Sequence, residues 1–156
     1  MRIGRGLATF ATSVCLTIFA VAASTACAAD ASTAERKHDF DRWESAIAAF
    51  EAADREHPPA PARILFVGSS TIRLWPTDTM LADLKVVNRG FGGSEMIDSL
   101  HFAERIILPH RPRVMLIYAG TNDLSRGTTP CQILSDFRDL VAKVHAASPE
   151  TEIVFL

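Results

Sequence analysis

Several signatures of well-defined chemistry are missing from this 156-residue sequence. It has no Cys-x-x-Cys and no His-Glu-x-x-His, and its five histidines are too scattered along the chain to suggest another metal site. It also lacks the Gly-x-Ser-x-Gly of α/β-hydrolases, a complete Gly-x-Gly-x-x-Gly and a Walker lysine. These absences argue against zinc enzymes, α/β-hydrolases and nucleotide-binding domains.

An excess of positive charge is missing as well. The chain has 16 Lys and Arg against 18 Asp and Glu, for a formal net charge of −2. A nucleic-acid partner is therefore not expected, because such proteins carry a basic surface for the phosphate backbone. At 48% hydrophobic residues the chain is long enough for one buried core, which favours a single domain.

The first thirty residues have the pattern of a targeting segment. Two arginines precede an uncharged apolar stretch, and small residues up to Ala28 precede the first acidic residue, Asp30. This order predicts a signal peptide over residues 1–28, and therefore a secreted or periplasmic protein without a stable membrane span after cleavage. A transmembrane anchor is an alternative, since the apolar stretch is about long enough to cross a bilayer. Lipid attachment at Cys27 is another, although Ser24 stands where a bacterial lipobox usually has a large aliphatic residue.

Residues 29–60 are expected to form an N-terminal helix and a Pro-rich linker. Phe40, Trp43, Ile47 and Phe50 recur at helical spacing, with charged residues largely between them. The aromatic stripe could be a ligand surface, but core packing is the commoner use of such a pattern. The paired prolines after His57 then end the helix.

Beyond the prolines, strands and helices alternate. Residues 63–67, 85–87, 113–119 and 151–156 are expected to be strands, whereas residues 94–109 and 129–148 have helical periodicity, with starts at Ser94 and at Thr129. The strands are apolar on both faces, which predicts an α/β fold with a parallel sheet covered by helices over residues 61–156.

Three loops follow the first three expected strands and should open at one edge of the sheet, where open parallel sheets bind ligands. They read Gly-Ser-Ser at 68–70, Asn-Arg-Gly-Phe-Gly-Gly-Ser-Glu at 88–95 and Gly-Thr-Asn-Asp at 120–123. Each has a simple structural explanation, as a helix cap or a tight turn. Together they supply what acyl transfer requires: a serine nucleophile, a glycine N–H and an asparagine amide for the oxyanion.

These segments resemble the first three blocks of the SGNH hydrolases, also called the GDSL esterase/lipase family. The resemblance runs from about Arg63 to Leu156 and implies a three-layer, flavodoxin-like α/β fold. It identifies Ser70 as the nucleophile, Gly93 as a backbone oxyanion donor and Asn122 as a side-chain donor. Ser69 departs from the pattern, because the family usually has aspartate before the nucleophile.

The resemblance implies ester hydrolysis through an acyl-enzyme, without a metal or an organic cofactor, on a small-molecule, glycan or lipid ester. The family's Asp-x-x-His block, which supplies the base and its orienting acid, occurs nowhere in the 156 residues. We therefore expect the hydrolase domain at 61–156 to be incomplete and the chain as printed to be nearly inactive. The alternative is a module on the same fold that binds an acyl group or a carbohydrate without turnover.

Overall fold

The computed structural model describes residues 37–58, 60 and 63–156. The predicted signal peptide at 1–28 lies outside these residues. Within the described residues, no helix is both long and apolar enough to cross a membrane.

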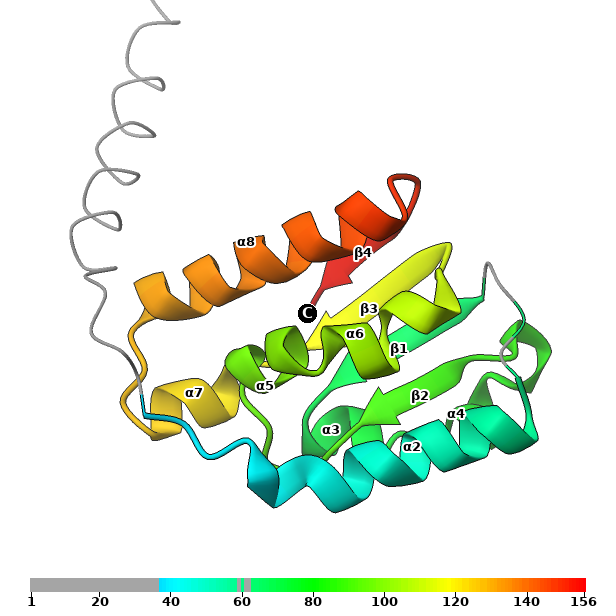
Figure 1. Ribbon diagram of the computed structural model, residues 1–156, viewed down its shortest axis with the longest axis horizontal. Coiled ribbons are helices and arrows are strands. Elements are labelled where there is room, and N and C mark those ends of the chain that lie inside the picture. Colours follow the sequence, from blue (N-terminus) through cyan, green and yellow to red (C-terminus); the bar gives the residue numbers. More distant parts are fainter. Residues whose placement is uncertain (1–36, 59, 61–62) are drawn as a thin grey trace, which may run out of the picture. The chain divides into compact units, whose positions relative to one another are not determined.

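The centre of the fold is a parallel sheet with the strand order β2-β1-β3-β4. The strands are β1 (Ile64–Gly68), β2 (Val87–Gly90), β3 (Val114–Tyr118) and β4 (Glu152–Phe155). Figure 1 shows the four strands running in one direction, so that their carboxyl ends lie at one edge. This order corresponds to the first four strands of a flavodoxin-like sheet. The predicted α/β class and parallel sheet are confirmed.

Helices cover both faces of the sheet, as the alternation of side chains along β1 requires. Leu65 and Val67 point into the main core, which also contains Ile47 of α2 (Glu44–Glu56). The residue between them, Phe66, lies on the opposite face, where its ring contacts Trp75 at a centroid distance of 5.2 Å. That second face is covered by the chain around α3 (Ser70–Arg73).

The N-terminal helix packs along the domain instead of standing apart from it. A single 3₁₀ turn, η1 (Asp41–Trp43), leads into α2, which ends at Glu56, two residues before Pro58. Ile47 is fully buried, and Phe40, Trp43 and Phe50 pack against the main core. The expected use of the aromatic stripe in core packing is therefore confirmed.

The expected helix at 94–109 is wrong in its continuity. The segment forms α5 (Met96–His101), α6 (Ala103–Ile106) and the 3₁₀ turn η3 (Leu108–His110). Its start also differs, because the cap is Glu95 and not Ser94. In a capping box, the backbone N–H of Glu95 donates to Oδ2 of Asp98 at 2.8 Å, and the side chain of Glu95 accepts from the backbone N–H of Asp98. The first break is at Phe102, whose ψ of 5° is not that of an α-helix, and Pro109 lies in the 3₁₀ turn that ends the segment.

The predicted start at Thr129 is confirmed in α8 (Pro130–Ala147). Thr129 and Gln132 form a capping box, with Pro130 in the first turn. By contrast, strand β2 begins two residues later than expected. Lys85 has a φ of 49° in the left-handed region, which a strand cannot accommodate.

Four short elements lie in segments that the sequence pattern left as loops. They are α3, α4 (Thr77–Met80), the 3₁₀ turn η2 (Ala82–Leu84) and α7 (Thr121–Ser125). Two of them, α3 and α7, directly follow β1 and β3, and they carry Ser70 and Asn122.

Candidate active site

The loop after β1 turns tightly against the end of β3. Gly68 has a φ of +142°, and a Cβ atom there would lie 2.0 Å from the carbonyl oxygen of Tyr118. The N–H of Ser69 donates to that same carbonyl at 3.2 Å. Only glycine fits this position, so the chain leaves the sheet at a fixed point.

The two serines that follow lie in different environments. Ser69 is 4% exposed and precedes α3 without a side-chain capping bond. Ser70 is half-buried and is the first residue of α3. Of the two hydroxyls, that of Ser70 is the better placed to meet a ligand.

Helix α3 is pressed onto the end of β2 at Gly90. A Cβ atom at Gly90 would lie 2.2 Å from the backbone nitrogen of Arg73. The N–H groups of Arg73 and Leu74 donate to the carbonyls of Ser69 and Ser70 at 3.0 and 2.9 Å. These contacts fix the backbone of Ser70 beside the loop that carries Gly93.

Ser70 and Gly93 line one cleft, with a volume of about 740 Å³. One wall comes from η1 and α2, which contribute Trp43 and Phe50, and the other from α3 and the loop after β2. Gly93 has a φ of +81°, and a Cβ atom there would lie 3.4 Å from Cη2 of Trp43. The structure thus brings two of the three predicted site residues to one cavity.

The loop around Gly93 is held from outside the cleft by Arg126. The Nη1 atom of Arg126 donates to the carbonyl oxygen of Gly93 at 3.0 Å and to Oε1 of Glu95 at 2.6 Å. Glu95 is 4% exposed, so the carboxylate of this ion pair is buried. The pair fixes which way the peptide of Gly93 faces.

The third predicted residue, Asn122, is not among the residues that line the cleft. Its side-chain amide donates to the carbonyl oxygen of Ser94 at 2.8 Å, one residue beyond Gly93. An asparagine amide carries two N–H donors, and this bond uses one of them. Asn122 therefore lies next to the Gly93 loop and braces it.

Asp123 is fully buried behind this loop. Its Oδ1 accepts the backbone N–H of Met96 at 2.9 Å, whereas its Oδ2 has no hydrogen-bond partner in the described part of the chain. Burial raises the pKa of Asp123 above its ordinary value, against the lowering effect of the backbone N–H of Met96. This carboxyl joins α7 to the start of α5.

No histidine lines the cleft in the described residues. His110 is 1% exposed in the 3₁₀ turn before β3, at the opposite edge of the sheet from Ser70. His145 contacts the carbonyl of Thr151 at 3.0 Å from the end of α8. The remaining three are each engaged elsewhere: His38 with Asp98 at 2.7 Å, His101 stacked on Phe40, and His57 in a different cavity.

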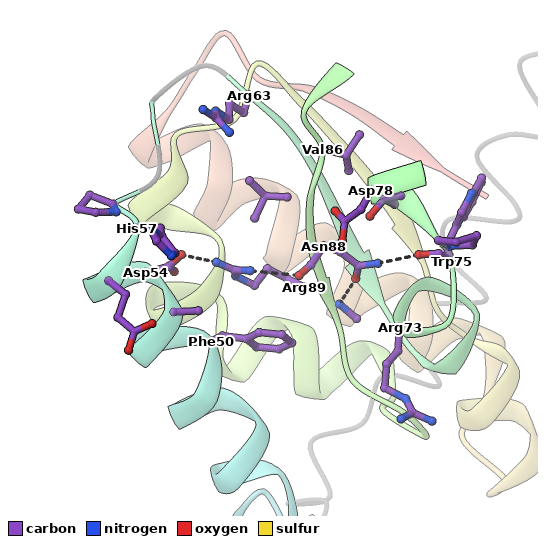
Figure 2. A pocket seen from close by; sticks show the side chains of 17 residues that line it. Phe50, Asp54, His57, Arg63, Arg73, Trp75, Asp78, Val86, Asn88 and Arg89 are labelled. Atoms are coloured by element: carbon purple, nitrogen blue, oxygen red, sulfur yellow. Dashed lines mark hydrogen bonds and ion pairs between the residues drawn. The ribbon is translucent and has the colours of Figure 1, made fainter. Parts of the chain in front are cut away.

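That different cavity, of about 840 Å³, lies along the edge strand β2 and is shown in Figure 2. Its polar groups largely bind one another: Arg89 pairs with Asp54, and the amide of Asn88 donates to the carbonyl of Ile72 at 2.7 Å. Arg73 lines both cavities and in Figure 2 lies far from Arg63 and His57. Neither Ser70 nor Gly93 lines this cavity.

A family model for GDSL-like lipase/acylhydrolase proteins matches residues 70–156. The chain belongs to this family. The match begins at Ser70 and includes Gly93 and Asn122. No curated protein sequence matches the chain.

Solved structures agree on the fold. A Streptococcus pneumonia protein described as a platelet activating factor superposes with a TM-score of 0.65 at 17% identity, over 92% of this chain and 60% of its own. An acylhydrolase structure from Bacteroides fragilis gives a TM-score of 0.59 at 18% identity, over 77% and 58%. A GDSL-like lipase from Bacteroides thetaiotaomicron gives 0.57 at 16% identity, over 75% and 57%. The chain thus spans about three fifths of the length of these structural relatives.

Sequence reasoning missed several residues that build the cleft, among them Arg42 and Arg73. The spacing offered one signal for Arg73, which lies one helical turn after Ser70 and so shares its side of α3. Trp43 and Phe50 were assigned to the core, and they both pack against it and line the cleft.

Proposed function

We propose that this member of the GDSL-like family is a serine-dependent ester hydrolase with Ser70 as the nucleophile. The observation that carries the proposal is that Ser70 and Gly93, from loops after two neighbouring strands, line the same cleft. A half-buried serine hydroxyl beside a glycine backbone suits the attack on a carbonyl and the stabilisation of the oxyanion that results. We also propose that the chain is exported, with residues 1–28 as the signal peptide.

The reaction takes place in two steps, acylation of Ser70 and hydrolysis of the acyl-enzyme. The Oγ of Ser70 bonds to the carbonyl carbon, the ester C–O bond breaks, and the alcohol leaves with the proton that the serine loses. Water then attacks the acyl-enzyme and releases the acid and the free serine. The N–H of Gly93 and the second N–H of Asn122 would hold the oxyanion in both steps, once Asn122 turns that donor toward the cleft.

The test is hydrolysis of 4-nitrophenyl acetate by the 156-residue chain and by Ser70→Ala. We expect slow release of 4-nitrophenol by the printed chain, because the Asp-x-x-His block that supplies the base occurs nowhere in the 156 residues. Ser70→Ala should remove the part of this release that depends on the serine hydroxyl. Ser69→Ala is the matched control, since it removes the neighbouring hydroxyl and should retain most of the activity. Equal turnover by wild type and Ser70→Ala would contradict the nucleophile assignment.

A second candidate is a module that binds an acyl group or a carbohydrate without turnover. It is favoured by one observation, that no described histidine reaches the cleft of Ser70. Calorimetry on the wild-type chain, following both the binding of an ester and its hydrolysis, distinguishes the two candidate functions. Saturable binding with no release of acid would support the module, whereas release of acid that depends on Ser70 supports the hydrolase.

A further inference from the structure

The described charged side chains that line the cleft of Ser70 are all positive. Among the described residues that line it, the charged side chains are Arg42 and Arg73, and the others are aromatic, small or glycine. No carboxylate shares the lining with them in this part of the chain. A cavity lined with cations and free of anions favours a negatively charged ligand.

The guanidinium of Arg73 lies directly beside the Gly93 loop. A Cβ atom at Gly92 would lie 2.8 Å from Nε of Arg73 and 3.3 Å from its Cζ and Nη2. The backbone of Arg73 is fixed in position, because its nitrogen packs closely against Gly90 at the end of β2. A cation is thus held one helical turn after Ser70 and next to the predicted oxyanion donor.

Arg73 has no acidic partner among the described residues, unlike three other arginines of the domain. Arg89 pairs with Asp54, Arg105 with Glu44 and Glu51, and Arg126 with Glu95. Arg73 is exposed, and its fork of N–H donors can bind a carboxylate through two parallel hydrogen bonds.

Arg42 places a second cation on the same cleft. Its Cζ lies 4.5 Å from the centre of the Trp43 ring, and that ring borders Gly93. The stacking holds the guanidinium at the cleft without using a carboxylate of the protein. Arg42 and Arg73 therefore flank the space in which an ester would lie.

We propose that the ester bound beside Ser70 carries a carboxylate or a similar anionic group, which Arg73 binds and which Arg42 attracts. The proposal rests on the proposed function for the ester itself, but the recognition of the anion follows from the arginines alone. The anion belongs either to the acyl part or to the alcohol part of the ester, and both have the same chemistry toward a guanidinium.

The experiment uses two matched pairs of probes. Monomethyl succinate and dimethyl succinate differ by a carboxylate in the acyl part, whereas 4-acetoxybenzoate and its methyl ester differ by a carboxylate in the alcohol part. Binding of all four to the full chain carrying Ser70→Ala is measured by calorimetry at low ionic strength. We expect tighter binding of the anionic member of at least one pair, and the pair that responds identifies the part that carries the anion.

Adding Arg73→Gln to Ser70→Ala should weaken binding of the preferred anionic probe by about tenfold and leave its neutral partner unchanged. The matched control is Arg138→Gln, an exposed arginine on α8 that does not line the cleft, which changes net charge equally. Salt at 0.5 M should reduce the preference more in the parent than in Arg73→Gln, which keeps only the attraction of Arg42. Circular dichroism checks that each variant is folded.

The proposal is overturned if both members of each pair bind equally, or if Arg73→Gln and Arg138→Gln have the same effect. Because the binding assay uses protein without the Ser70 hydroxyl, its result does not depend on turnover. Failure of the proposed function would appear instead as unchanged hydrolysis of 4-nitrophenyl acetate by Ser70→Ala.

Discussion

Single residues around the Gly93 loop have opposite electrostatic environments. Glu95 is buried but receives a charged donor from Arg126, so its negative charge is balanced. Asp123 is buried beside it with one oxygen unpartnered in the described part of the chain, and the nearby charge of Glu95 adds to the raising of its pKa. Of the two carboxyls, Asp123 is the one whose charge the fold disfavours.

This predicts a pH dependence for Asp123→Asn. A raised pKa means that the folded protein holds the proton of Asp123 more tightly than the unfolded chain does. Protonated Asp123 therefore makes its full contribution to the free energy of unfolding below the ordinary carboxyl pKa. This contribution is lost as the pH rises through the raised pKa of Asp123 in the folded protein. Asparagine does not ionise, so the free energy of unfolding of Asp123→Asn relative to wild type should increase over that window.

Urea denaturation of both proteins from pH 3.5 to 7.5 measures this difference. Asp83→Asn serves as the control for the loss of one carboxylate outside the site, because Asp83 is exposed in η2. A flat difference for Asp123→Asn would mean that the buried carboxyl is better solvated than its contacts indicate.

At the scale of elements, the candidate site depends on how closely α3 approaches the sheet. A Cβ atom at Gly68 would displace the carbonyl oxygen of Tyr118, and a Cβ atom at Gly90 would displace the backbone nitrogen of Arg73. The position of the loop that carries Ser70 is consequently fixed by two glycines on neighbouring strands.

We expect Gly90→Ala to cost about 3 kcal/mol in the free energy of unfolding, because its methyl group would meet the rigid backbone of α3 at 2.2 Å. It should also lower any Ser70-dependent hydrolysis, since α3 must move. Gly127→Ala is the comparison: it has nothing within 4 Å of its added carbon and a φ of +87°, so about 1 kcal/mol of backbone strain is its expected cost. Thermal unfolding of the two variants ranks them, and an equal cost would contradict the packing argument.

The elements that the sequence predicted well are those whose signal is local. The cap at Thr129 lies within one turn of the helix it starts, and the strands expected at 63–67, 113–119 and 151–156 are contiguous apolar runs, so these elements were predicted to within one residue at each end. The break of the helix at Phe102 and the late start of β2 depend on capping and backbone conformation that apolar periodicity does not encode. For the site, the order of the motifs predicted that Ser70 and Gly93 lie at one edge of the sheet. The wall formed by α2 was not predicted, because it depends on a contact between segments that are far apart in the sequence.

At the scale of the whole molecule, α2 is joined to the sheet by a largely buried polar cluster of Asp54, Arg89 and His110. Arg89 pairs with Asp54, and Nε2 of His110 lies 3.3 Å from Oδ2 of the same carboxylate. The guanidinium of Arg89 also lies over the ring of Phe50, at 4.9 Å from its centre. Strand β2, η3 and α2 therefore meet at one carboxylate.

This cluster predicts loss of stability in mild acid. Burial, followed by the charge of Arg89, lowers the pKa of His110 below its ordinary value, while Asp54 opposes the shift. The unfolded chain then takes up a proton at a higher pH than the folded protein does. Stability is full above the ordinary histidine pKa and falls as the pH drops through the lowered value.

We expect His110→Gln to flatten the decline in the free energy of unfolding between pH 7.5 and 5, whatever its effect at pH 7.5. His57→Gln, at an exposed position after α2, is the control for the loss of an imidazole outside the cluster. Since α2 also forms one wall of the Ser70 cleft, acid should loosen the cleft together with the cluster. Fluorescence of Trp43, measured in a Trp75→Phe background, follows that wall, and a transition at the same pH as global unfolding is the expected result. A slope unchanged by His110→Gln would assign the acid sensitivity to other groups.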